Sequence, residues 1–167
     1  MTKILVVSDT HGKNSYMHDA IALEHPFDML IHCGDVEGNL YSILGPDPGY
    51  EFHAVRGNCD YSGYPDRLIL TVEDKRILVV HGHEHAVRYS NDALFRAASQ
   101  SSADVILFGH SHMPEIEERY GILAVNPGSL AKPRQQTRRR TYAILTITEG
   151  SFPRADIKEL PPSVWDV

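Results

Sequence analysis

Cysteine is scarce in this sequence. Cys33 and Cys59 are the only two among 167 residues, and they form no Cys-x-x-Cys motif. This usage indicates neither a disulfide framework nor a zinc site built from thiolates.

Long apolar runs are also missing. The longest uncharged apolar stretches span four or five residues, whereas a membrane-spanning helix needs about 20. Near the amino terminus, Lys3 is followed by only four apolar residues before Ser8, which is too few for a signal peptide. We therefore expect a cytoplasmic protein with no membrane partner.

Basic residues are outnumbered by acidic ones. There are 16 Lys and Arg against 22 Asp and Glu, and the net charge is -6. This balance argues against general nucleic-acid binding, which favours a basic surface. A length of 167 residues suits one buried core rather than two. We expect a single domain over residues 1–167, and the sequence leaves its oligomeric state open, a homo-oligomer included.

Histidine, by contrast, is abundant, with ten residues. Several of these histidines lie directly after short apolar runs, at places where other metal-ligand residues also occur. The apolar runs cover residues 4–7, 29–31, 52–55, 77–80 and 105–108. The side chains that follow these runs are Asp9 and His11, then Asp35, then Asn58, then His81, and finally His110 and His112. Residues i and i+2 of an extended segment point to the same side. In open α/β sheets the crevice at the carboxyl ends of the strands binds ligands, so we predict a metal site there.

The donor types indicate the kind of metal. Imidazole, carboxylate and amide without thiolate suit manganese, iron, zinc or nickel better than magnesium or calcium. Seven donors are too many for one tetrahedral ion and suit two ions that share a bridging carboxylate. Two such ions stabilise both the attacking and the leaving oxygen of an in-line displacement. The pattern therefore predicts phosphoester hydrolysis of a small substrate.

The spacing of apolar residues predicts the fold. The first third alternates strands with helices, which implies right-handed crossovers and a parallel core. We expect Asn14 or Ser15 to cap the first helix and Ser90 to cap a later one. The expected strands cover residues 3–7, 27–32, 52–55, 67–72, 76–80, 104–108, 115–120, 122–125, 141–148 and 155–160, with a short helix at 39–44. The spacing over residues 67–80 predicts a β-hairpin. For the whole chain we expect two packed sheets with helices on their outer faces.

At these residues the chain resembles a known family. The order Asp-x-His, Gly-Asp, Gly-Asn, His-Gly-His and Gly-His-x-His resembles the calcineurin-like metallophosphoesterase superfamily. The short length, the segment Gly57-Asn58-Cys59-Asp60 and the segment Asn126-Pro127-Gly128-Ser129 are similar to its small YfcE-type phosphodiesterase branch. The resemblance implies an α/β fold, a four-layer α/β/β/α sandwich of two mixed sheets flanked by helices.

The resemblance also implies roles for the residues that match the motifs. Asp9, His11 and His112 would hold one ion, Asn58, His81 and His110 the second, and Asp35 would bridge the two. Manganese is the expected metal, with iron, zinc or nickel as alternatives. A water or hydroxide between the ions would attack phosphorus. Asn58, Cys59 and His81 are the expected catalytic residues.

Cys59 departs from the pattern of the wider superfamily, in which many members have a histidine at this place. That histidine can stabilise the transition state or protonate the leaving oxygen. A thiol of ordinary pKa is a poorer general acid near neutrality. The YfcE-type branch shares the cysteine, which implies activity on phosphodiesters such as aryl model esters.

Two other functions stay open. The same centre could serve a phosphomonoesterase or nucleotide pyrophosphatase. Alternatively, the chain could be a non-catalytic metal-binding interaction scaffold resembling the retromer subunit of the same fold. Because none of the seven ligands is missing, the sequence favours an enzyme.

Several further residues have two interpretations. The run over residues 132–140 holds five basic residues and no acidic one, and we favour a solvated loop over a clamp for an anionic substrate. Arg56 is a second candidate for binding phosphate. His32 is either a partner of the site or a satisfied core histidine, and a turn at Gly82 is expected to carry His83 and His85 away from the metal.

Overall fold

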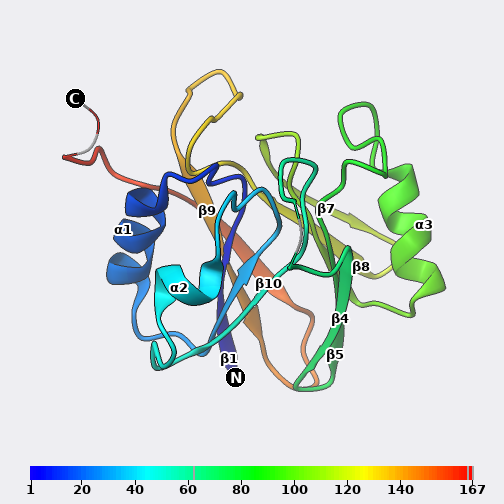
Figure 1. The fold of residues 1–167 in the computed structure, drawn as a ribbon. Coiled ribbons are helices and arrows are strands. Elements are labelled where there is room, and N and C mark those ends of the chain that lie inside the picture. The colour runs from blue at the N-terminus through cyan, green and yellow to red at the C-terminus, as the bar shows by residue number, and fades with distance from the viewer. Residues whose placement is uncertain (62, 165, 167) are drawn as a thin grey trace.

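The computed structural model describes residues 1–61, 63–164 and 166. Two five-stranded mixed sheets pack face to face, and helices cover their outer faces, with α1 and α2 on one side and α3 on the other (Figure 1). This arrangement confirms the predicted four-layer α/β/β/α sandwich. Among the described residues, no helix is long and apolar enough to cross a membrane.

The first sheet has the strand order β10-β9-β1-β2-β3. Its three parallel strands are β1 (Thr2–Val7), β2 (Met29–His32) and β3 (Glu51–Ala54), and its antiparallel strands are β9 (Thr141–Ile147) and β10 (Arg154–Glu159). Val7 pairs with His32, and His32 pairs with Ala54. The three parallel strands therefore end at one level, and the loops that leave them lie side by side.

The second sheet has the order β4-β5-β6-β8-β7. Its strands are β4 (Arg67–Val72), β5 (Lys75–Val80), β6 (Val105–Leu107), β8 (Ile122–Pro127) and β7 (Pro114–Arg119). Strands β5, β6 and β8 are parallel, while β4 and β5 form the predicted antiparallel hairpin. The carboxyl ends of β5 and β6 carry the second group of predicted ligands.

Side chains from the two sheets interleave in the centre of the molecule. On β1, Ile4 and Val6 face the other sheet, whereas Leu5 and Val7 face helices α1 (Asn14–Glu24) and α2 (Leu40–Leu44). Helix α3 (Asp92–Gln100) covers the outer face of the second sheet. Strands that are buried on both faces read as continuous apolar runs, which explains why the sequence marks them so clearly.

The predicted helix caps are wrong. Helix α1 already includes Asn14 and Ser15, and Lys13 occupies the cap position without a side-chain hydrogen bond. Helix α3 is preceded by Asn91, whose side chain instead donates to Glu115 and Glu117 of β7. Ser90 lies one residue earlier, although its Oγ still accepts from the backbone N–H of Asp92 at 3.3 Å. Tertiary hydrogen bonds and loop geometry thus override the local capping preference.

Candidate metal centre

The seven predicted ligands all lie in loops that leave the carboxyl ends of parallel strands. Asp9 and His11 follow β1, Asp35 follows β2, Asn58 follows β3, His81 follows β5, and His110 and His112 follow β6. Five of the seven have positive φ angles, between 46° and 70°. Non-glycine residues rarely adopt this left-handed conformation, and when they do so they cluster at functional sites. The loops are thus held in a specific, strained shape.

A first group of donors forms around the carboxylate of Asp9. One donor atom each from Asp9, His11, Asp35 and His112 lies within 4.8 Å of all the others. Asp9 Oδ1 is 3.1 Å from His112 Nε2 and 3.9 Å from His11 Nε2. The two imidazole Nε2 atoms are 3.3 Å apart. The set predicted for the first ion therefore comes together.

A second group forms around His81. Its Nε2 is 3.1 Å from Asn58 Oδ1 and 3.3 Å from Asp35 Oδ2, and the centre of its ring is 5.2 Å from that of His110. The same Oδ2 atom of Asp35 is 3.7 Å from His11 Nε2. Asp35 thus lies between the two groups, where a bridging carboxylate is expected.

Hydrogen bonds at the far side of each ring fix which nitrogen faces the centre. Nδ1 of His81 donates to the carbonyl of Cys33 and Nδ1 of His112 to the carbonyl of Lys132, both at 2.7 Å. Nδ1 of His11 contacts the carboxylate of Glu37. Because a carbonyl or carboxylate oxygen only accepts, Nδ1 of each of these three rings carries the hydrogen, and Nε2 is the nitrogen that can coordinate a metal.

The Nε2 atoms of His11 and His112 and the carboxylate oxygens of Asp9 and Asp35 therefore converge on one point. Asp9 Oδ1 is buried and accepts no hydrogen bond in the described part of the chain, although three imidazoles surround it. A buried, unsatisfied carboxylate oxygen is costly. A divalent cation among these atoms would satisfy it, so the residues present fit a metal centre.

The charges of these groups also suit metal binding. Burial acts to raise the pKa of Asp9, but the adjacent His112 and His81 outweigh it and lower that pKa. For Asp35, His81 outweighs burial and holds the pKa well below its usual range. Burial, together with the neighbouring His81 and Arg88, lowers the pKa of His110 to about 4. Near neutral pH the carboxylates are therefore ionised and His110 carries a free lone pair.

Glycine is required where the loops approach each other. A Cβ atom on Gly57 would lie 2.1 Å from Asp35 Oδ1, and one on Gly109 would lie 2.0 Å from Ser8 Oγ and 2.7 Å from Asp9 Oδ2. Real Cβ atoms do not come this close to their neighbours. The glycines of the Gly-Asn and Gly-His motifs therefore allow the ligand loops to meet.

Three residues near the centre were not predicted from the sequence. The carboxylate of Asp60 accepts from the backbone N–H groups of Asp35, Glu37 and Gly57, each at 2.8 Å. Two of them have a signal in the sequence: Asp60 is the last residue of the segment Gly57-Asn58-Cys59-Asp60, and Glu37 lies two residues after the predicted ligand Asp35. No pattern points to Arg88, which reaches the centre only through the fold.

Two further histidines lie near the predicted ligands, His32 and His83. His32 is fully buried and uses both ring nitrogens, because Nδ1 accepts from Gly34 N–H at 3.1 Å and Nε2 lies 2.9 Å from Thr10 Oγ1. Burial lowers its pKa to about 4. It is a satisfied core histidine that holds the Thr10 and Gly34 loops together. The ring of His83 lies 5.4 Å from that of His81, centre to centre, so it flanks the second group more closely than expected.

The basic run divides into two parts. Lys132 and Arg134 line a cavity of 170 Å³ at the centre, together with Arg88. At the end of the run, Arg139 pairs with Glu159 at 3.4 Å and Arg140 with Asp166 at 2.7 Å. The anion-clamp interpretation therefore suits the start of the run, and the solvated-loop interpretation suits its end.

Arg56 does not take part in this cavity. Its guanidinium binds Asp66, with Nε and a terminal nitrogen each 2.7 Å from the carboxylate. That Arg56 helps to bind phosphate stays a prediction, because Arg56 pairs with Asp66 and does not line this cavity.

Comparison with known proteins found related phosphoesterases. The chain is 40% identical over 148 residues to the probable metallophosphoesterase YsnB of Bacillus subtilis, which covers 86% of this chain and 83% of that protein. It is 25% identical over 143 residues to a phosphodiesterase of Methanocaldococcus jannaschii, covering 75% of this chain and 82% of that protein.

Solved structures show the same fold. A predicted phosphoesterase of Streptococcus pneumoniae superposes with a TM-score of 0.82 at 31% identity, covering 95% of this chain and 89% of that one. Vps29 of Entamoeba histolytica, solved with Zn²⁺, gives a TM-score of 0.73 at 20% identity over 95% of this chain and 99% of its own, which shows the fold alone. Residues 2–150 match the calcineurin-like phosphoesterase superfamily domain, and the chain therefore belongs to that superfamily.

Proposed function

We propose that this protein is a phosphodiesterase that works with two divalent metal ions, with manganese as the expected metal. The observation that carries the proposal is the position of Asp35, whose Oδ2 lies 3.7 Å from His11 Nε2 in one donor group and 3.3 Å from His81 Nε2 in the other. A single carboxylate oxygen that faces two sets of lone pairs suits two cations better than one.

The donor groups assign the ligands. Asp9, His11 and His112 would hold the first ion, Asn58, His81 and His110 the second, and Asp35 both. When bound, the ions would supply positive charge to the phosphoryl oxygens and lower the pKa of a water nucleophile. The homologous phosphodiesterase of M. jannaschii supports this class of reaction.

Side chains around the ligands suit a phosphate ester. Arg88, Lys132 and Arg134 line the same cavity as the metal ligands, and the structure records no ion pair for them among the described residues. Cations that are not neutralised by protein carboxylates can bind phosphate oxygens through charge-assisted hydrogen bonds. We therefore infer that they position the anionic substrate.

Cys59 would shape the choice of substrate. Cys59 is exposed, but desolvation of its thiol and the nearby carboxylates of Asp35 and Glu37 raise the pKa of that thiol. An acid of raised pKa donates a proton poorly at the transition state. Phosphodiesters with leaving groups that depart without a proton, such as p-nitrophenolate, should therefore react better than phosphodiesters with alkoxide leaving groups.

The test is metal analysis of the purified protein coupled to hydrolysis of bis(p-nitrophenyl) phosphate, with and without added manganese. Two ions per chain and metal-dependent turnover are expected, with lower kcat/KM on p-nitrophenyl phosphate. A preference for the monoester would favour a phosphomonoesterase or pyrophosphatase instead. Bound metal without turnover of any phosphoester would favour the interaction scaffold.

A further inference from the structure

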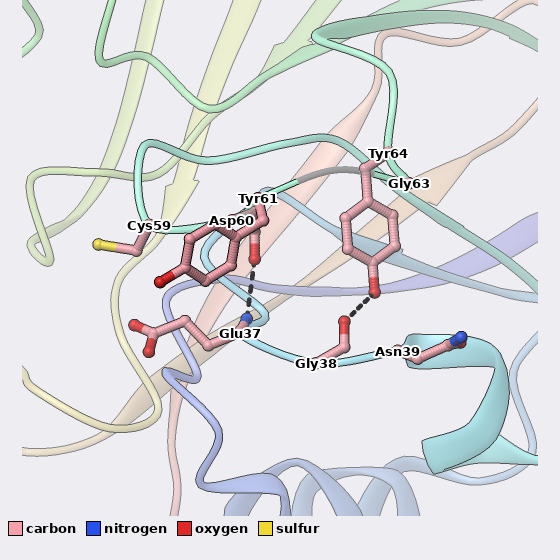
Figure 2. Close-up of a pocket in the computed structure, with 8 residues that line it drawn as sticks. All are labelled: Glu37, Gly38, Asn39, Cys59, Asp60, Tyr61, Gly63 and Tyr64. Carbon is pink, nitrogen blue, oxygen red and sulfur yellow. Dashed lines mark hydrogen bonds between the residues drawn. The ribbon is translucent and has the colours of Figure 1, made fainter.

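A second cavity adjoins the metal centre on one side. Its volume is 480 Å³, within the range of about 300–1,000 Å³ that is usual for small-molecule sites. It is lined by Glu37, Gly38, Asn39, Cys59, Asp60, Tyr61, Gly63 and Tyr64 (Figure 2). Cys59 also lines the metal-centre cavity, so a molecule bound at the metals has direct access to this pocket.

The pocket is held together by hydrogen bonds to the metal loops. Tyr64 Oη donates to the carbonyl of Gly38 at 2.6 Å and accepts from the N–H of Leu40 at 2.8 Å. Asp60, in its wall, binds the N–H groups of Asp35 and Glu37. The segments on either side of the pocket, residues 37–39 on one side and 59–61 with 63–64 on the other, are thereby linked to each other and to Asp35.

The walls of the pocket suit a flat ring. The Tyr64 side chain points toward Gly38, and the Tyr61 side chain extends on the side of Glu37 and Cys59 (Figure 2). Tyr61 is 99% exposed and presents a ring face to solvent, while Gly38 and Gly63 add no side chains. An aromatic face beside a phosphate-binding centre is a stacking surface for an aromatic group.

The negative charge of the residues that line this pocket disfavours an anionic ligand. Among the described residues, the charged side chains that line the pocket are the carboxylates of Glu37 and Asp60, and no Lys, Arg or His of that part of the chain does so. The cations Arg88, Lys132 and Arg134 line the metal-centre cavity and not the tyrosine-lined pocket. A negatively charged substituent would thus be repelled here, whereas an uncharged ring would not.

We propose that this tyrosine pocket binds one organic substituent of the phosphodiester, and that the substituent is an uncharged aromatic ring such as an aryl group or a nucleobase. This inference rests on the proposed function, because it assumes that the phosphate occupies the metal centre. Tyr61 then determines specificity through ring stacking without acting on the reacting atoms.

The experiment uses phosphonates, which the enzyme cannot hydrolyse. Calorimetry measures how tightly each one binds to the manganese-loaded protein. Benzylphosphonate carries an aromatic ring, and cyclohexylmethylphosphonate carries a saturated ring of similar size. Ethylphosphonate carries no ring. Benzylphosphonate is expected to bind about tenfold more tightly than the other two. A carboxylate at the para position of the benzyl ring should abolish this advantage.

Variants separate ring stacking from a structural effect. Tyr61→Ala is expected to remove most of the benzyl preference and Tyr61→Phe to keep it. Tyr120→Ala is the matched control, because Tyr120 is 96% exposed and lies in the turn between β7 and β8, at the amino end of β8 and away from the centre. Equal affinity for the benzyl and cyclohexylmethyl compounds, or a benzyl preference that Tyr61→Ala leaves intact, would overturn the proposal.

The two proposals can fail separately. Binding of the phosphonates requires no turnover, so a benzyl preference in a protein that hydrolyses no phosphodiester would sink the proposed function alone. Hydrolysis of bis(p-nitrophenyl) phosphate without any benzyl preference would keep the proposed function and reject the tyrosine pocket.

Discussion

The two sheets contribute different chemistry to the candidate metal centre. Loops of the first sheet carry the oxygen donors Asp9, Asp35 and Asn58 and one imidazole, His11, while loops of the second sheet carry only imidazoles, His81, His110 and His112. Neither sheet alone gathers the donors of either proposed ion. The centre is therefore a property of the interface between the sheets, and its integrity depends on how closely their edges meet.

Hydrogen bonds across this interface hold the two sets together. His81, from the second sheet, donates to the carbonyl of Cys33 in the first. The N–H of His110 donates to Asp9 Oδ2 at 3.1 Å, and Ser129 Oγ donates to the carbonyl of Asp9 at 2.8 Å. The oxygen donors are thus positioned partly by the loops that carry the imidazoles, and substitutions on one sheet should be felt on the other.

Asp35→Asn should have the largest effect, because Asp35 Oδ2 faces both donor groups and is assigned to both ions. We expect kcat/KM on an aryl phosphodiester to fall at least about 1,000-fold, or about 4 kcal/mol, with loss of both ions. Asn58→Ala should cost about 10- to 100-fold, since it would remove one neutral ligand of one ion. Kinetics and metal analysis of both variants measure this, and equal losses would contradict the bridging assignment.

Gly109→Ala should come next, because it acts where the sheets meet. The new Cβ would lie 2.0 Å from Ser8 Oγ, so the loops must separate, at a cost of about 1–3 kcal/mol in the free energy of unfolding. Metal content should fall as well. Gly121→Ala is the control: unlike Gly109 it has a positive φ, so it carries the backbone strain of a new Cβ, but it has no atom within 4 Å of its Cβ position. Denaturant unfolding and metal analysis test this, and a metal-replete Gly109→Ala protein would show that the interface tolerates expansion.

Arg134→Gln should have a moderate effect confined to substrate binding. Removing one cation from the cavity is expected to raise KM about tenfold and to leave the metal content unchanged. Arg138→Gln is the matched control in the same loop, since Arg138 is exposed and does not line the cavity. Steady-state kinetics on the diester would reveal the difference, and identical KM values for the two variants would remove Arg134 from the substrate site.

Cys59→His should have the smallest effect and should increase an activity. An imidazole near its ordinary pKa is a better general acid than this thiol, so we expect a several-fold higher kcat/KM on phenyl phosphate, a monoester whose phenolate departs less readily than p-nitrophenolate. Comparing monoester and diester rates with the wild-type protein measures the change. If the variant keeps both metals but loses activity on both substrates, Cys59 does not limit protonation of the leaving group.

Much of the fold could be predicted because it depends on local patterns. The apolar runs on β1, β2, β5 and β6 are visible since these strands are buried on both faces. Helix caps could not be predicted reliably, because Asn91 binds Glu115 and Glu117 in a strand far along the chain.

The sequence by itself determined the order and type of the donors, since each directly follows a strand that its own apolar run defines. Only the tertiary structure decided which donors meet: His11 faces His112 from the opposite sheet, and Asp9 Oδ1 is left without a hydrogen bond among the described residues. It also placed Arg88 and the start of the basic run at the centre and paired Arg56 with Asp66. The physical reason is that strand patterns are local, whereas distances between loops depend on sheet packing and on left-handed backbone angles that only the folded chain enforces.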